Sequence, residues 1–235
     1  MSSFTKLKGI GKILYSLPYS IYFNLKHLPF KQALKLPIIL YHAKVIGKGK
    51  YIIEGPIKTG MIRLGFPIIS IYKGKGIVLE NKGTIIFQGK AGIGANAGLS
   101  IGKYGKLTLG DDFKNSYGMK LVCYHEITIG HTARFGWESF LCDTDFHSLK
   151  SEDGTKHAKG FGKIKFGDEV WVGSFSKFYK NTEIPSRCTV AANTLVNKKI
   201  ECEPYSLIYS GAGIKVKHTG YYRDINDDVI DYTTP

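Results

Sequence analysis

The chain has 235 residues, of which 43% are hydrophobic and 22% are charged, the balance of an ordinary globular protein with room for a large core. Its 28 glycines, 15 tyrosines and 13 phenylalanines favour strands over helices. The formal net charge of +14 indicates a polyanionic partner such as anionic lipid or a phosphorylated ligand. Nucleic acid is not expected, because no recognition motif is present and most lysines are scattered.

The first segment, residues 1–44, is predicted to be helical, basic and aromatic. No Asp or Glu occurs from Met1 to Ile53, and lysines flank the apolar stretches ILYSLPYSIYFNL and LPIILY. This pattern suits contact with an anionic membrane surface, and a solvated basic face is the alternative. A membrane-spanning helix is not expected, because Pro18, Pro29 and Pro37 interrupt the segment and no apolar run reaches roughly 18 residues. No signal-peptide cleavage pattern follows, so the expected location is the cytoplasm, including the inner face of the membrane.

A six-residue repeat organises residues 45–203. From Phe87 the chain reads FQGKAG, IGANAG, IGKYGK, LGDDFK, LVCYHE, IGHTAR, FGWESF and LCDTDF, with short slips, as far as Phe146. It resumes at Phe166 as FGDEVW, VGSFSK, FYKNTE, IPSRCT, VAANTL and VNKKIE. Each unit opens with a large apolar residue, and the second residue is often Gly or Ala.

A period of six fits neither an α-helix nor simple strand alternation. It suits a short strand plus a turn, repeated around a prism with one large residue per side pointing inward. Each coil then buries its apolar faces only by stacking on its neighbours, and a small second residue lets the turn pass the next coil. The glycine-rich stretch from Val45 to Gly89 is expected to add earlier, less regular coils. An antiparallel sandwich with hairpins is the alternative.

The repeat breaks once, at LCDTDFHSLK, before a polar loop predicted at residues 148–163. Asp143, Asp145 and His147 occupy alternate positions, which point to one face if the segment is a strand. Loops on rigid scaffolds often carry function, so this is the candidate reactive site. No metal site is expected, because Cys123, Cys142, Cys188 and Cys202 lack ligand spacing and suit small buried positions.

Longer passages resemble a known family. GDEVWVGS (167–174), TVAANTLVNKKI (189–200), YSLIYSGAGIKVK (205–217) and the N-terminal IYFNLKHLPFKQALKLPIIL are similar to the hexapeptide-repeat acyltransferases, in particular to O-acetyltransferases of capsular and surface polysaccharides. The resemblance implies an all-β, left-handed parallel β-helix with a short helical N-terminal segment, an extruded catalytic loop and a C-terminal extension, residues 204–235.

The resemblance also implies a reaction. The protein would move acetyl from acetyl-CoA to a hydroxyl, or as second choice an amine, of a sugar in a surface polysaccharide or its precursor. His147 would act as general base, a role for which an imidazole suits neutral pH. Asp143 and Asp145 would orient the ring or bind sugar hydroxyls, or would be turn residues that satisfy their own backbone. The alternatives are transfer of a longer acyl chain and a non-catalytic β-helix scaffold.

The donor site is implied to lie between subunits of a homotrimer. The family pattern puts coenzyme A contacts on Trp171, Gly173, Ser174, Ala192, Asn197, Lys198 and Lys215. A backbone N–H of Gly173 or Ser174 would stabilise the oxyanion, and the lysines would meet the phosphates of the nucleotide. The sequence departs from the family at FYKNTEIPSRC and at SGAGIK, which leaves the adenine contacts undefined.

Overall fold

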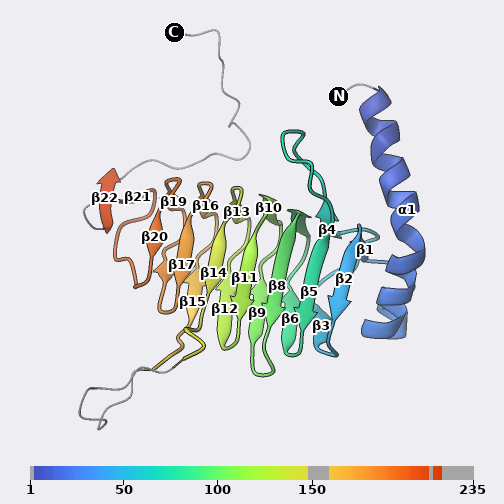
Figure 1. Ribbon diagram of the computed structural model, residues 1–235, viewed down its shortest axis with the longest axis horizontal. Helices are drawn as coiled ribbons and strands as arrows, with labels where there is room; N and C mark the ends of the chain where they lie inside the picture. Colours follow the sequence, from blue (N-terminus) through green and yellow to red (C-terminus); the bar gives the residue numbers. More distant parts are fainter. Residues whose placement is uncertain (1–2, 148–158, 212–213, 219–235) are drawn as a thin grey trace.

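The computed structural model describes residues 3–147, 159–211 and 214–218. Figure 1 shows a stack of β-coils with helix α1 (Ser3–His27) against its N-terminal end. A short helix, α2 (Phe30–Ala33), leads from α1 into the first strand. The β-coils begin at residue 38, within the segment expected to be helical, and strand pairing continues into the expected C-terminal extension.

The strands form three sheets, here named A, B and C. Sheet A contains β1 (Ile38–Leu40), β4 (Ile62–Phe66), β7 (Ala91–Ala95), β10 (Phe113–Tyr117), β13 (Arg134–Phe135), β16 (Trp171–Val172), β19 (Thr189–Val190), β21 (Leu207–Ser210) and β22 (Ile214–His218). Sheet B contains β2 (Ala43–Ile46), β5 (Ile77–Asn81), β8 (Ala97–Ile101), β11 (Lys120–Cys123), β14 (Phe140–Cys142), β17 (Lys177–Tyr179) and β20 (Leu195–Val196). Sheet C contains β3 (Lys50–Ile53), β6 (Thr84–Phe87), β9 (Lys106–Leu109), β12 (Glu126–Ile129), β15 (Ile164–Phe166) and β18 (Glu183–Ile184).

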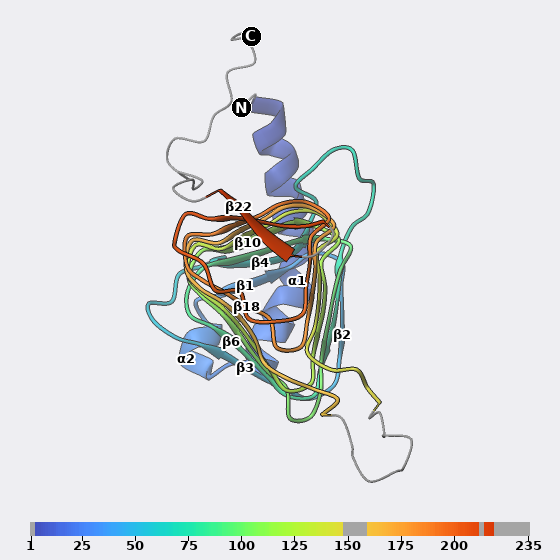
Figure 2. The same ribbon diagram turned by 90° about the vertical axis from the view of Figure 1, so that its left-hand side faces the viewer.

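The sheets wind as a left-handed parallel β-helix. From β1 to β20 each strand pairs in parallel with the strand three places along the chain, as β10 does with β7 and β13. At the C-terminal end β19 pairs in parallel with β21, and β21 pairs antiparallel with β22. Seen from the C-terminal end, the chain runs clockwise from sheet A at the top to sheet B at the right and sheet C at the lower left, while successive coils approach the viewer (Figure 2). That path is left-handed, against the usual preference of parallel crossovers. The predicted fold is confirmed, and the hairpin sandwich is wrong for the described part of the chain.

The six-residue register is also confirmed. The first residue of every unit quoted above points into the prism and is at most 2% exposed. These residues are Phe87, Ile93, Ile101, Leu109, Leu121, Ile129, Phe135, Leu141, Phe166, Val172, Phe178, Ile184, Val190 and Val196. Burying a side chain of this size contributes about 1.5–3 kcal/mol, so the column of large residues is the main source of stability.

The turns explain the small second residue of many units and the backbone conformation of the fourth. The fourth residue adopts a left-handed conformation, with φ between 52° and 68° from Asn96 to Asn193 in the regular units. The second residue faces the next coil, and a Cβ on Gly110 would lie 2.4 Å from the carbonyl carbon of Gly130. A Cβ on Gly130 would in turn lie 2.5 Å from that of Gly167. Glycine is therefore required at these two positions, where successive turns approach closely.

Helix α1 closes the first coil. The side chain of Asn24 donates to the Ile38 carbonyl at 2.7 Å and accepts from the Ile38 N–H at 3.2 Å. Ser20 Oγ accepts from the Leu40 N–H at 2.9 Å. Both side chains are buried, so the helix supplies the partners that a preceding strand would give to β1. Within the described residues, no helix is both long enough and apolar enough to cross a membrane.

Candidate functional site

The turns between sheets stack into three corners, which we name after the sheets they join. His147 lies at the BC corner, where the chain leaves β14. Of the loop predicted at residues 148–163, residues 148–158 lie outside the described part of the chain. β14 ends at Cys142, so strand alternation does not continue through Asp145 and His147. Asp143 is fully buried, whereas Asp145 and His147 are exposed. The three side chains therefore do not share one face.

Asp143 has a structural arrangement at this corner. Its two carboxylate oxygens accept the backbone N–H groups of Tyr124 and His125, at 2.7 and 2.8 Å, from the turn of the preceding coil. A buried carboxylate needs such partners, and these two define the direction of its side chain. This geometry corresponds to the turn-residue alternative for Asp143, and its catalytic role stays a prediction.

Asp145 helps to close the base of the loop. Its backbone N–H donates to the Gly160 carbonyl at 2.7 Å, and its carboxylate pairs with Lys180 of the next coil. Lys180 also donates to the carbonyl of Lys159 at 2.9 Å. The two ends of the break are thus tied together and to the scaffold. Lys163 strengthens the second end by pairing with Glu126 at 2.7 Å, and this hydrogen bond lowers the pKa of the Glu126 carboxyl.

His147 projects from this braced base. Its side chain is exposed and makes no hydrogen bond or ion pair with any residue that the structure describes. The preceding residue, Phe146, has a φ of 60° and packs edge-on against Tyr124, with ring centroids 5.0 Å apart. In the regular units the left-handed residue is the fourth, whereas here it is the sixth. The displaced turn directs the chain, and with it His147, away from the prism.

The predicted coenzyme residues lie in different parts of the scaffold. Trp171 is on the outer surface of sheet A and is 41% exposed. Gly173, Ser174 and Ala192 lie in successive turns of the AB corner. Asn197 and Lys198 follow β20 and are exposed at the BC corner, as His147 is. Lys215 belongs to β22, where it pairs with Tyr209 of β21. A single chain therefore places Asn197 and Lys198 at the same corner as His147, and the other predicted coenzyme residues on other parts of the prism.

The AB corner distinguishes between the two predicted oxyanion donors. The N–H of Gly173 donates to the Val190 carbonyl at 2.7 Å, so it belongs to the coil ladder and is not available to a substrate. The N–H of Ser174 donates to no acceptor within the described residues. Its hydroxyl oxygen accepts the N–H of Trp137 at 3.1 Å, which connects this turn to the preceding one. Ser174 is therefore the candidate donor at this corner.

The cysteines occupy the positions expected for small hydrophobes. Cys123, Cys142 and Cys188 are buried, and Cys202 is partly exposed. Burial, and then the nearby carboxylate of Asp143, raises the pKa of the Cys123 thiol well above its usual range. Within the described residues, no cluster of His, Cys, Asp and Glu is suited to a metal ion.

A cleft that the sequence reasoning missed lies across the outer surface of sheet A. Its volume is about 1040 Å³, and it covers β4, β7 and β10. The loop after β4 and the N-terminal part of α1 both project beyond this sheet (Figure 2). Its cationic lining residues are Lys12, Lys58, Arg63, Lys90 and Lys114. The sequence did contain one indication of this cleft. Arg63, Lys114 and Arg134 occupy corresponding outward positions of β4, β10 and β13.

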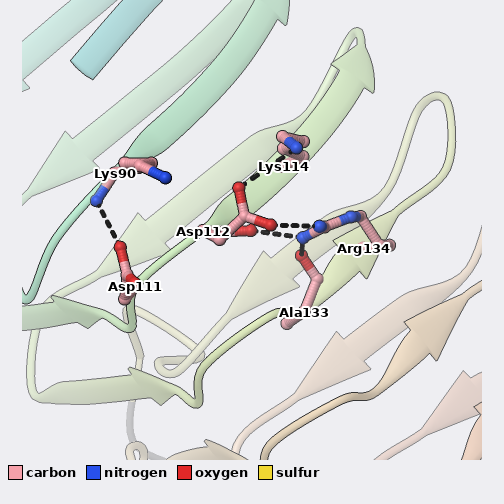
Figure 3. A network of polar contacts seen from close by, with 6 residues as sticks. All are labelled: Lys90, Asp111, Asp112, Lys114, Ala133 and Arg134. Carbon is pink, nitrogen blue, oxygen red and sulfur yellow. Dashed lines mark hydrogen bonds and ion pairs between the residues drawn. The ribbon is translucent and has the colours of Figure 1, made fainter. Parts of the chain in front are cut away.

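Asp112 is the acidic residue that lines this cleft, and Figure 3 shows its polar contacts. It pairs with Arg134 and with Lys114, the latter at 3.1 Å. The Arg134 guanidinium also bonds to the carbonyl of Asp112 and to that of Ala133, the latter at 3.2 Å. Partial burial acts to raise the pKa of Asp112, but the hydrogen bonds and charges of Arg134 and Lys114 outweigh it and lower this pKa.

The fold and the six-residue register define the class of this protein as a hexapeptide-repeat, left-handed β-helix protein. No protein-family model matches the chain, and no curated protein matches its sequence.

Three solved structures illustrate the likeness of fold. The polySia-specific acetyltransferase NeuO is 15% identical, with 80% of this chain and 91% of that chain covered and a TM-score of 0.48. The polysialic acid O-acetyltransferase OatWY is 17% identical, with coverages of 82% and 97% and a TM-score of 0.44. AntD, an N-acyltransferase from Bacillus cereus in complex with dTDP and 3-hydroxybutyryl-CoA, is 12% identical, with coverages of 86% and 93% and a TM-score of 0.41. At these identities the likeness concerns the fold, which rests on the strand pairing described above.

Proposed function

We propose that the protein is an acetyltransferase that moves acetyl from acetyl-CoA to a sugar hydroxyl of a surface polysaccharide or its lipid-linked precursor. The observation that carries the proposal is His147, an exposed imidazole that bonds to none of the described residues, at the one break in the repeat, on a loop base that is braced at both ends. The resemblance of the C-terminal passages to hexapeptide acyltransferases supplies the reaction. The low-identity likenesses of fold carry no part of it.

In this mechanism His147 takes the proton of the acceptor hydroxyl as the oxygen attacks the thioester carbonyl. The N–H of Ser174 donates to the oxyanion of the tetrahedral intermediate, and collapse of the intermediate expels the coenzyme A thiolate. Asp143 acts at a distance, because it holds the turn beneath the loop through Tyr124 and His125. The proton that His147 has taken is then available to the departing thiolate.

The site requires a second copy of the chain. His147 and Ser174 lie at different corners of the prism, with sheet B between them. The imidazole of one subunit would therefore meet a thioester held at the AB corner of its neighbour. A homotrimer places each BC corner against the next subunit's AB corner and produces equivalent sites by symmetry.

The N-terminal helices would bring the enzyme to an anionic membrane that carries the acceptor. Large apolar side chains remain exposed on them, among them Leu14, Tyr15, Tyr22, Phe30 and Leu34. Lysines flank these residues, and no acidic residue precedes Glu54 in the sequence. An apolar and aromatic surface with a cationic rim is the composition that binds at a lipid interface.

The first experiment tests the base. The His147→Ala variant should lose acetyl transfer by about 10²- to 10⁴-fold, while calorimetric binding of acetyl-CoA stays unchanged. The readout is mass spectrometry of the host's surface glycan, in cells that carry either form of the protein, for a difference of one acetyl group. His125→Ala is the matched control, because His125 occupies the same corner one coil earlier. If His125→Ala removes the acetyl group and His147→Ala does not, the assignment of the base is wrong.

The second experiment tests the shared site. Ala192→Trp should block the AB corner and inactivate the protein, as His147→Ala does at the BC corner. When the two variants are refolded together, mixed oligomers should regain activity, because one interface then carries both intact corners. Mixtures that stay as inactive as the separate variants would show that each chain works alone.

The third experiment tests membrane contact with the whole chain, because residues 20 and 24 are needed to close the first coil. The double substitution Leu14→Ser and Tyr22→Ser should lower co-sedimentation with phosphatidylglycerol vesicles. Val78→Ser with Leu195→Ser is the control, since both residues are exposed apolar side chains on sheet B. If the two double variants sediment equally, the proposed membrane contact of the N-terminal helices is wrong.

A further inference from the structure

The cleft on sheet A has the composition of a binding site, and the proposed reaction does not use it. It extends from the turn before β4, across β4, β7 and β10, to the loop that follows β4. His147 is at the BC corner, on the opposite side of the prism from this sheet. The inference therefore goes beyond the proposed acetyl transfer and can be tested without it.

Positive charge collects in the cleft from four separate segments of the chain. Lys12 comes from α1, Lys58 and Arg63 from the region of β4, Lys90 from the turn before β7, and Lys114 from β10. Asp112 is the acidic residue among those that line it, and its carboxylate is already shared by Lys114 and Arg134. The charged groups of Lys12, Lys58, Arg63 and Lys90 make no ion pair among the described residues. The backbone N–H of Lys90, but not its ammonium group, bonds to the Asp111 carboxylate at 2.7 Å. The site has an excess of unpaired cations.

Gly92 leaves the floor of the cleft open between Arg63 and Lys114. In the ladder of sheet A, Gly92 of β7 lies between Arg63 of β4 and Lys114 of β10. A Cβ on Gly92 would meet only Lys114 Cγ, at 3.7 Å, so the lysine stem crosses this strand. Neighbouring strands lie about 4.8 Å apart, so long side chains from both sides can reach one anionic group above Gly92.

Much of the remaining wall is apolar, although Thr59 and Ser70 also line it. The apolar residues include Ile13 of α1, Met61, Phe66 at the end of β4, and Pro67 and Ile68 at the start of the loop. Ile68 is 62% exposed although it lines the cleft. Tyr72 holds the loop in place by stacking on Tyr117, with ring centroids 4.1 Å apart. The cleft therefore offers a cationic floor and an apolar side that a fully hydrated anion would not use.

We propose that this cleft binds the phosphate-bearing end of an amphiphile. The phosphate lies above Gly92 between Arg63 and Lys114, and the first part of the apolar chain lies against Ile13 and Ile68. Ile13 is followed on α1 by Leu14 and Tyr15, two exposed side chains that do not line the cleft but add apolar surface to the same helix. Isoprenoid phosphates and phospholipids share this chemistry. An acidic sugar polymer carries charge without the chain and would leave the apolar wall unused.

The test measures binding by titration calorimetry with the full chain and no acetyl donor. The probes are farnesyl diphosphate, inorganic diphosphate, farnesol, and dihexanoyl phosphatidylglycerol below its micelle concentration. We expect at least one of the two amphiphiles to bind about tenfold or more tightly than inorganic diphosphate or farnesol, with affinity that falls as salt is added. If farnesyl diphosphate binds more tightly, the amphiphile is an isoprenoid phosphate. If phosphatidylglycerol binds more tightly, it is a phospholipid.

A matched pair of glycine variants locates the binding. Gly92→Val fills the floor, and a side chain is tolerated there because the only neighbour is a flexible lysine. Gly98→Val is the control: Gly98 of β8 faces Lys120 of β11 just as Gly92 faces Lys114, but on sheet B. We expect Gly92→Val and Arg63→Ala each to weaken binding of the tighter amphiphile about tenfold or more. Gly98→Val and His147→Ala should bind as the unaltered chain does, and all four variants should keep its melting temperature.

Three results would overturn the proposal. The first is tight binding of inorganic diphosphate equal to that of the amphiphiles, which would make the cleft a simple anion site. The second is an equal loss of binding in the Gly92→Val and Gly98→Val variants, which would place the ligand elsewhere. The third is no measurable binding of either amphiphile. Loss of acetyl transfer in the His147→Ala variant bears on none of these results, so the two proposals fail separately.

Discussion

The first coils and the last coils of the β-helix use the same path in different ways. From Phe166 to Val196 the chain repeats in units of six without insertion, and every corner turns in the same way. From β1 to β8 the corners vary in length, a long loop leaves the AB corner after β4, and α1 closes the end. The regular coils are built of mutually dependent turns, and the irregular coils supply the cleft. Regularity provides the scaffold, and departures from it provide sites.

The largest effect is expected from replacing one glycine in the late coils, Gly167, and one in the early coils, Gly92. A Cβ on Gly167 would lie 2.4 Å from the backbone nitrogen of Ser186 in the next coil, so Gly167→Val should destabilise the fold by about 3 kcal/mol or more. Gly92→Val, in the early coils, should cost below about 0.5 kcal/mol. Urea unfolding of both variants measures the difference, and equal losses would contradict the distinction between a glycine in a stacked turn of the regular coils and one on an open strand of the early coils.

The second comparison lies within the break itself. Asp143→Asn replaces one acceptor oxygen by an amide that also donates, opposite a backbone N–H of the Tyr124–His125 turn, and should cost about 2–3 kcal/mol. Asp145→Asn removes an exposed ion pair with Lys180 and should cost below about 1 kcal/mol. Equilibrium denaturation ranks the two variants. The reverse order would mean that Asp145, and not Asp143, anchors the corner.

The third prediction concerns the contacts by which α1 closes the first coil. Asn24→Ala leaves the N–H and the carbonyl of Ile38 without their partners in a buried position, and should cost about 1–3 kcal/mol. Ser100→Ala is the control, because its hydroxyl donates to Glu80 in a partly exposed position. Hydrogen exchange at Ile38 and Leu40 should rise in the first variant only. Unchanged protection there would show that β1 holds its place without the helix.

The smallest expected effect is on the pH dependence of stability. The folded pKa of Asp112 is lowered by Arg134 and Lys114 against the effect of burial. Its contribution is therefore present above the unfolded pKa, near 3.9, and is lost as the pH falls through the folded value. Asp112→Asn should cost below about 1 kcal/mol at pH 7, after solvent screening, and nothing near pH 2. A difference that stays constant with pH would mean that packing, and not charge, is responsible.

The sequence predicted the scaffold well because the scaffold depends on local chemistry. One large residue, one small residue and a turn in every six determine the coil, and Phe166, Val172 and Phe178 occupy their positions for that reason alone. The handedness came from resemblance to known proteins. The early coils were predicted only as irregular, because their loops are set by long-range packing such as that of Tyr72 on Tyr117.

The candidate sites were less predictable for a related reason. Strand alternation would have grouped Asp143 with His147, but the strand ends at Cys142 and the carboxylate turns inward to the preceding coil. The cleft was missed because its residues, such as Lys12, Arg63 and Lys114, are far apart in the sequence. Only the winding of the coils brings them to one surface, and their spacing has no short motif.

The closure of sheet A at both ends affects how the molecule behaves in a crowded solution. A stack of parallel strands with bare ends invites another copy to add its own strand, and then a third, into an endless fibre. Here α1 occupies one end through Ser20 and Asn24, and β22 runs antiparallel to β21 at the other. Within the described residues, neither end of this sheet therefore offers the parallel template that polymerisation would copy.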